Sequence, residues 1–93
     1  MKLKIIEYFW SVGHRTRRKG TYKLPLVEGK ILKPHFANLK IDQVEEDKVI
    51  VSFNRDDGTL IKKLTVEKGK KNYYRPMSMD GGYEYVLKIT KFF

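Results

Sequence analysis

The dipeptide Asp57-Gly58, placed between two alternating apolar runs, constrains the fold more than any other feature of the sequence. Glycine adopts the positive φ that tight turns require, and Asp-Gly between such runs is the strongest short-range signal for a β-hairpin. The stretch from Lys48 to Glu67 therefore predicts two antiparallel strands. Their alternating apolar residues are Val49, Val51 and Phe53 before the turn and Leu60, Leu64 and Val66 after it.

Two registers of this hairpin are compatible with the pattern. A loop made of Asp57 and Gly58 pairs Val49 with Val66, whereas a loop from Arg55 to Gly58 pairs Val49 with Leu64. Both registers keep the apolar side chains on one face. A loop one residue longer than Asp57-Gly58 would turn the two faces against each other, which the side-chain period of two disfavours. The pattern thus predicts which face is buried and leaves the turn open.

Length and composition indicate one domain, residues 1–93, in a cytoplasmic protein. The 93 residues suffice for a single core, and the absence of cysteine excludes disulfides and thiolate metal sites. The N-terminal apolar run is interrupted by Glu7, and the basic stretch from His14 to Lys19 stands where a signal peptide would have its cleavage site. No apolar stretch approaches the length of a membrane span. We therefore expect no membrane partner.

The remaining pattern predicts an all-β fold. Turn residues recur every eight to twelve positions, which is typical of a β-sandwich or a small β-barrel. We predict a single antiparallel β-sandwich, with the small barrel as the alternative, because several strands alternate cleanly between apolar and polar residues. The expected strands beyond the hairpin cover Lys2 to Val12, Thr21 to Val27, Lys30 to Lys33, Phe36 to Val44, Asn72 to Arg75 and Tyr83 to Thr90.

Two of these segments need comment. Lys2 to Val12 is apolar on both faces from Ile5 to Trp10, which predicts a strand that is covered on both sides or lies where sheets meet. Phe36 to Val44 fits a helical stripe as well as a strand, and the strand alternation is the cleaner of the two patterns.

The last third of the chain resembles the closing strands of immunoglobulin-like sandwiches. A Tyr-containing strand, the turn Asp80-Gly81-Gly82 and an alternating strand from Tyr83 follow one another in that order. The resemblance implies an immunoglobulin-like arrangement of strands and no particular function.

Catalytic and metal-binding patterns are not found in the sequence. His14 and His35 lack the spacing of metal ligands on one element, and no Gly-rich phosphate loop or nucleophile elbow is present. The acidic turn at Asp56-Asp57-Gly58 does not have the ligand spacing of a calcium loop. We therefore expect a protein that is not an enzyme and holds no cofactor.

Twenty Lys and Arg residues against eleven Asp and Glu give a net charge of +9, which favours anionic partners. The densest cluster lies between Gly13 and Gly20, where we predict a flexible basic loop. This cluster is either a solvated loop or a phosphate-binding site. In the second case, two lysines further along the chain could belong to the same site. The residues of this hypothetical site are Arg15, Arg17, Arg18, Lys19, Lys70 and Lys71.

The aromatic residues, which include Tyr8, Trp10 and Tyr73, allow a base-stacking sheet, but filling the core of a small sandwich is the stronger explanation. A second hypothetical site combines tyrosine, arginine and methionine in an adaptable protein-interaction surface. Its members are Tyr73, Tyr74, Arg75, Met77 and Met79.

The sequence therefore predicts a small non-catalytic binding module. The expected partner is another protein of unknown identity, and the alternative is a nucleic acid bound by the loop from His14 to Lys19. The oligomeric state does not follow from the sequence.

Overall fold

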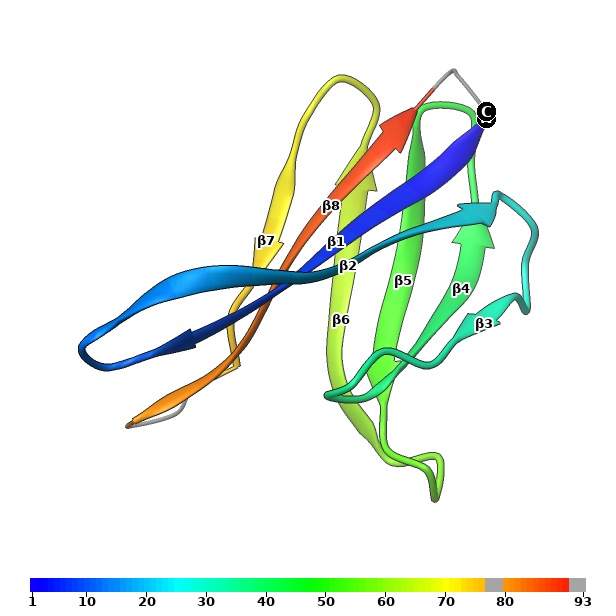
Figure 1. The fold of residues 1–93 in the computed structure, drawn as a ribbon. Coiled ribbons are helices and arrows are strands. Elements are labelled where there is room, and N and C mark those ends of the chain that lie inside the picture. Colours follow the sequence, from blue (N-terminus) through cyan, green and yellow to red (C-terminus); the bar gives the residue numbers. More distant parts are fainter. Residues whose placement is uncertain (77–79, 91–93) are drawn as a thin grey trace.

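The computed structural model describes residues 1–76 and 80–90, and this part of the chain consists of β-strands and turns with no helix. The prediction that Phe36 to Val44 forms a strand is confirmed, since strand β4 covers most of it. The strands in chain order are β1 (Lys2–Ser11), β2 (His14–Pro25), β3 (Ile31–Leu32), β4 (Asn38–Val44), β5 (Lys48–Asn54), β6 (Leu60–Glu67), β7 (Asn72–Tyr74) and β8 (Gly81–Thr90), shown in Figure 1.

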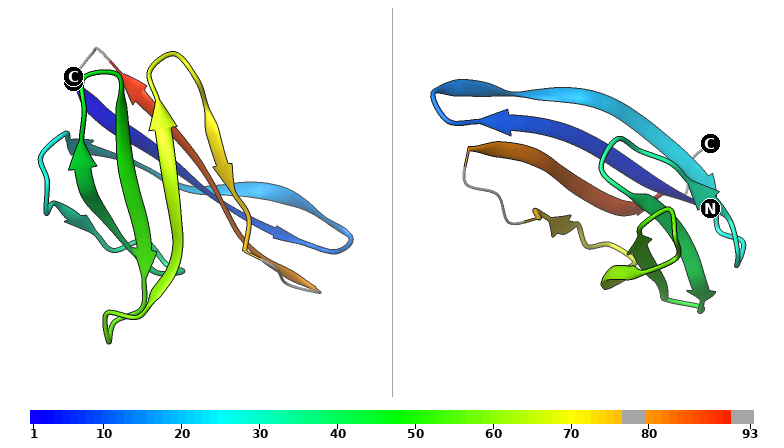
Figure 2. Two further views of the ribbon diagram at one scale, coloured as in Figure 1. Left: turned by 180° about the vertical axis from the view of Figure 1, so that it is seen from behind. Right: turned by 90° about the horizontal axis from the view of Figure 1, so that it is seen from below.

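The strands form two four-stranded antiparallel sheets that pack together as a sandwich. The first sheet has the order β2-β1-β8-β7 and the second has the order β3-β4-β5-β6. The sandwich is therefore confirmed, and the two sheets do not close into a barrel (Figures 1 and 2). Apart from the β1–β8 pair, all neighbours within a sheet are also neighbours in sequence. This meander differs from the Greek-key connections of immunoglobulin domains.

The central hairpin combines features of both expected registers. Val49 pairs with Val66 and Val51 with Leu64, as an Asp57-Gly58 loop would require. The turn is nevertheless longer, because a bulge shifts the register between Phe53 and Asn54. Gly58 has a φ of 90°, in the left-handed region that favours glycine.

The bulge corrects one detail of the predicted faces. Leu60 is 53% exposed, whereas Ile61, which the alternation placed outside, packs against the core. A bulge inserts one extra residue into a strand, so the inward positions beyond it change parity.

The core lies between the two sheets and is built mainly from alternate residues of β1, β8, β4 and β5, with Val66 of β6. Each large side chain that is fully buried contributes about 1.5–3 kcal/mol to folding. The fully buried apolar residues are Leu3, Ile5, Leu39, Ile41, Val49, Val51, Phe53, Val66, Tyr85 and Leu87.

The outer face of β1 is open, contrary to the expectation that this strand is covered on both sides. The outer face has the partly exposed residues Ile6, Tyr8 and Trp10. On the inner face of the same strand, Leu3 and Ile5 are buried in the core. No element of the described chain packs over this face, because the first sheet contacts the second sheet through its other side. An apolar stripe on an uncovered sheet is uncommon in a monomer and marks a surface that can bind a partner.

The predicted basic loop is also wrong, because residues His14 to Lys19 belong to strand β2. The chain reverses at Val12 and Gly13, and Ser11 already pairs with His14. A turn with Gly13 at a φ of 79° suffices to connect the strands, so the basic residues are free to pair with β1. We call the far end of this hairpin, residues 8–18, the arm. Figures 1 and 2 show the arm extending beyond the second sheet.

Candidate binding surface

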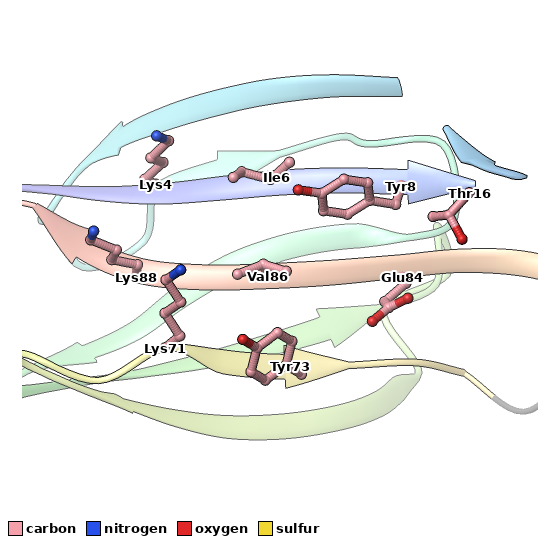
Figure 3. Close-up of a pocket in the computed structure, with 9 residues that line it drawn as sticks. All are labelled: Lys4, Ile6, Tyr8, Thr16, Lys71, Tyr73, Glu84, Val86 and Lys88. Carbon is pink, nitrogen blue, oxygen red and sulfur yellow. The ribbon is translucent and has the colours of Figure 1, made fainter. Parts of the chain in front are cut away.

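The candidate site is the outer face of the first sheet. It contains a groove of about 360 Å³ that spans strands β1, β8 and β7 and reaches β2 at Thr16. Figure 3 shows the lining side chains standing on the same side of the sheet. The residues that line the groove are Lys4, Ile6, Tyr8, Thr16, Lys71, Tyr73, Glu84, Val86 and Lys88.

Four lysines form a row straight across this face. Lys4 pairs with Lys23 of β2 on one side and with Lys88 of β8 on the other. Lys71 follows beside Lys88, because the next residue, Asn72, pairs with Leu87. Residues that pair across antiparallel strands point to the same side, so Lys23, Lys4, Lys88 and Lys71 make one continuous group, the lysine row.

The lysine row is electrostatically unfavourable in the isolated protein. Like charges directly opposite each other destabilise a sheet, because the facing side chains leave the strands with their Cβ atoms only about 5 Å apart. The ion pairs of the described residues involve other lysines, Lys48 with Glu45 and Lys70 with Glu67. None of the four row lysines is therefore neutralised by a carboxylate of residues 1–76 and 80–90.

An apolar row lies beside the lysine row. Ile6 pairs with Thr21 and with Val86, and Val86 pairs with Tyr73 of β7. Tyr73 is 60% exposed, so its ring is accessible to a ligand. In Figure 3 this central row separates Lys4, Lys88 and Lys71 from the opposite end of the groove.

Two cation–aromatic pairs lie at the opposite end. The guanidinium carbon of Arg75 lies 4.0 Å from the ring centroid of Trp10, and that of Arg18 lies 5.9 Å from the centroid of Tyr8. Such contacts hold a flat cationic group against an aromatic surface. Glu84, which pairs with Tyr8, is the acidic residue that lines this groove.

The outer face of the second sheet has a different character. Its groove of about 370 Å³ is lined by the cations Lys33, Lys40 and Arg55 and by the acids Asp42 and Asp56. The mixed signs largely cancel, and the Asn38 side chain already donates a hydrogen bond of 3.1 Å to Asp56. The groove of the first sheet has three cations against one acid, whereas that of the second sheet has three cations against two acids.

The structure divides the first hypothetical site between two faces. Tyr8 pairs with Arg18 and Phe9 with Arg17, and successive residues of a strand point to opposite sides. Arg18 consequently lies over Tyr8 on the outer face, whereas Lys19 lies 5.7 Å from the ring of Phe9.

The two later lysines of that site also separate. Lys70 forms an ion pair of 3.0 Å with Glu67, while Lys71 joins the lysine row. Arg15 is exposed on the arm.

The second hypothetical site is divided in a similar way. Tyr73 faces outward, but Tyr74 packs against Phe53 with ring centroids 4.8 Å apart, and burial raises its pKa. Arg75 lies on Trp10 rather than beside the tyrosines. Met77 and Met79 lie outside the described residues.

Sequence reasoning missed the lysine row because its members are far apart in the chain. Positions 4, 23, 71 and 88 become neighbours only through the pairing of four strands. The signal available in the sequence was the polar side of each predicted strand, and a correct strand order would have been needed to align those sides.

Glu7, which interrupts an apolar run in the sequence, is a buried carboxylate in the structure. It is 0% exposed and lies on β1, opposite Gly20 and Tyr85. Tyr85 donates from its hydroxyl to Oε2 at 2.7 Å, and the backbone N–H of His35 donates to the same oxygen at 2.9 Å. His35 Nδ1 lies 2.5 Å from Oε1, and Tyr22 donates to that oxygen at 3.5 Å.

These contacts give Glu7 a structural role. The carboxylate ties the connection between β3 and β4, where His35 lies, to the first sheet. The His35 ring also stacks on Tyr83, with centroids 5.7 Å apart and planes within 7°. A carboxylate that accepts this many hydrogen bonds without contact to solvent is suited to joining the two layers rather than to proton transfer with a substrate.

The hydrogen bond to Glu7 predicts how stability depends on alkaline pH. Burial, followed by the hydrogen bond and charge of Glu7, raises the pKa of Tyr85 above its ordinary value of 10.0. The folded state therefore keeps the phenol proton at a pH where the unfolded chain releases it, so this contribution is complete below about pH 10 and is lost as the pH rises further.

We expect the free energy of unfolding to fall more steeply between about pH 9 and pH 11 in the parent than in Tyr85→Phe. Urea titrations at several pH values measure both curves. Curves of equal slope would contradict the prediction.

Within the described residues, no three His, Asp or Glu side chains are grouped closely enough to hold a metal ion. The same residues contain no helix with the length and apolar character needed to cross a membrane. Searches against family models, curated proteins and solved structures found no match, so the functional assignment depends on the geometry of this face.

Proposed function

We propose that the protein is a small non-catalytic binding module that holds an anionic partner on the outer face of its first sheet. The observation that carries the proposal is the lysine row, in which Lys23, Lys4, Lys88 and Lys71 lie side by side across four strands. A row of like charges opposes folding unless an anion neutralises it. A linear anion lying across the strands would contact several of these lysines at once.

The open apolar row beside the lysines supports a binding role as well. The outer face leaves Ile6 and Val86 partly exposed and Tyr73 exposed, whereas the apolar residues on the inner face of the same sheet are buried against the second sheet. An interaction through Tyr73, Tyr74 and Arg75 as one patch has less support, because Tyr74 packs against Phe53 of the core.

A pair of matched double variants tests the proposal. Lys4→Gln/Lys88→Gln removes two charges from the lysine row, and Lys40→Gln/Lys63→Gln removes two from the outer face of the second sheet, where both lysines pair with Ser52. Each variant changes the net charge from +9 to +7. Differences between them therefore report position rather than total charge.

We expect the row variant to bind inorganic polyphosphate about ten-fold or more weakly at about 50 mM salt, because two charge-assisted contacts are lost. The control variant should bind nearly as the parent does. Titration calorimetry measures both affinities. Thermal melting should place the row variant at or above the parent, since the substitution relieves like-charge repulsion.

Two results would contradict this proposal. Equal losses in the two variants would mean that net charge alone attracts the polyanion. A larger loss in Arg15→Ser/Arg17→Ser than in the row variant would assign binding to the arm, where those residues are exposed.

A further inference from the structure

We propose, building on the anion-binding role above, that the partner is a single-stranded nucleic acid. Its phosphates would lie along the lysine row, and its bases would lie over Tyr73 and the neighbouring apolar row. The face supplies the two components that such ligands require, which are a line of cations for the backbone and aromatic rings for the bases. Of the two rings that line the groove, Tyr73 is exposed and Tyr8 is partly exposed.

The spacing of the two rows suits a nucleotide. Lys4 and Ile6 are two residues apart on β1, as are Lys88 and Val86 on β8, so the rows are separated by about 7 Å. This is comparable to the reach from a phosphate across its sugar to the base. The row itself crosses four strands, a distance of about 14 Å, and other four-stranded sheets stack about two or three bases on their aromatic residues.

The rings and guanidinium groups of the face offer stacking surfaces. Tyr73 is 60% exposed and is followed two residues later by Arg75, whose guanidinium carbon lies 4.0 Å from the centroid of the Trp10 ring. Bases stack both on aromatic rings and on arginine planes. Stacking is tolerant of sequence because every base has a π-face.

Glu84 gives the ligand an orientation. It lines the groove at the end opposite Lys4, Lys88 and Lys71, as Figure 3 shows. A carboxylate repels phosphate, so the backbone is confined to the lysine end and the bases point toward Glu84. Carboxylates accept hydrogen bonds from the exocyclic amino group of cytosine, which thymine lacks. The arrangement therefore favours cytosine over thymine.

A duplex fits this face less well, because its bases are stacked on one another and present only their edges in the grooves. An acidic peptide could neutralise the lysine row, but it has no planar groups that would require the ring of Tyr73. These two ligands serve as alternatives in the experiment.

The experiment compares dC12, rC12, dT12, a twelve-residue abasic phosphodiester, a dC12·dG12 duplex and poly-glutamate. Binding is followed by the fluorescence of Trp10, the single tryptophan of the chain, and by anisotropy of labelled ligands. We expect dC12 to bind most tightly, dT12 less tightly, and the abasic polymer, the duplex and poly-glutamate most weakly. Log affinity should fall with log salt with a slope of about −2 to −3, as three or four single-strand phosphate contacts require.

Two variants test the base contacts. Tyr73→Leu should weaken dT12 about 5- to 100-fold, the range expected for loss of one stacked base, while Tyr73→Phe retains the ring and should bind as the parent does. Neither change should alter binding of the abasic polymer. Glu84→Gln should bind the abasic polymer more tightly and reduce the preference for dC12 over dT12.

The outcomes separate this inference from the proposed function. Equal affinity for dT12 and the abasic polymer, or a Tyr73→Leu variant that binds dT12 like the parent, would overturn the nucleic-acid assignment and leave the lysine row as an anion site. Tighter binding of the duplex or of poly-glutamate would also overturn it. Tighter binding of rC12 than of dC12 would support the inference with RNA as the ligand, and the reverse would support it with DNA.

Discussion

Replacing Val51 by aspartate is expected to prevent folding. Val51 is 0% exposed and lies at the centre of the second sheet, paired with Ile41 on one side and Leu64 on the other. The substitution removes about 1.5–3 kcal/mol of apolar burial and adds a carboxylate with no cation among its pairing partners. A domain of this size has a total stability of about 5–14 kcal/mol, so the combined loss is a large part of it.

Far-ultraviolet circular dichroism and thermal melting test this prediction. The matched control is Lys63→Asp, which introduces the same side chain next to Leu64 but on the exposed outer face. We expect the control to melt within a few degrees of the parent, since exposed substitutions change stability little. A cooperative transition of Val51→Asp within that range would contradict the burial of this face.

The Val51 prediction illustrates which parts of the fold the sequence determines by itself. Alternation places Val49, Val51 and Phe53 on one side of β5 whatever the partner strand does, and all three are buried. The turn was harder to predict, because the bulge near Asn54 depends on the backbone hydrogen bonds that residues Arg55 to Thr59 form. The backbone N–H of Arg55 donates to the carbonyl of Thr59 at 2.9 Å, and the local sequence pattern does not predict this hydrogen bond.

The candidate surface could not be predicted from the local sequence, because it depends on the order in which the strands pair. The densest charge cluster in the sequence, His14 to Lys19, is divided by its strand between two faces. The lysine row, in contrast, combines residues from four separate strands. Charge density along a chain therefore predicts a surface only where the chain is a loop or a helix face, because a strand sends consecutive charges to opposite sides.

The open face of β1 also depends on the whole fold rather than on the local sequence. A strand with two apolar faces predicts burial on both sides only when enough elements exist to cover it. This chain has four strands for each layer and no further element in the described residues, so one face of β1 stays exposed. Under the proposed function, the ligand would cover the apolar side chains of Ile6, Tyr8 and Trp10, which the core leaves partly exposed.

The second large effect on stability concerns Glu7, the buried carboxylate on the inner face of β1. We expect Glu7→Ala to lower the free energy of unfolding by about 3–5 kcal/mol. The substitution leaves a cavity and removes the acceptor of the Tyr85 hydroxyl and of the His35 backbone N–H, which donate at 2.7 and 2.9 Å. Urea denaturation with a constant m-value measures the change.

Two further variants separate the hydrogen bonds from the cavity. Glu7→Gln keeps the side-chain volume and one acceptor oxygen, so it should lose roughly half as much as Glu7→Ala. The double variant Glu7→Ala/Tyr85→Phe should lose less than the sum of its single variants, because both remove the same hydrogen bond. Strict additivity would mean that the hydrogen bond between Tyr85 and Glu7 contributes nothing to stability. A Glu7→Ala variant within about 1 kcal/mol of the parent would mean that the carboxylate does not join the β3–β4 connection to the first sheet. Glu7 lies between Ile6 and Tyr8, whose side chains stand on the opposite face, so the same anchor fixes the strand that carries the proposed binding surface.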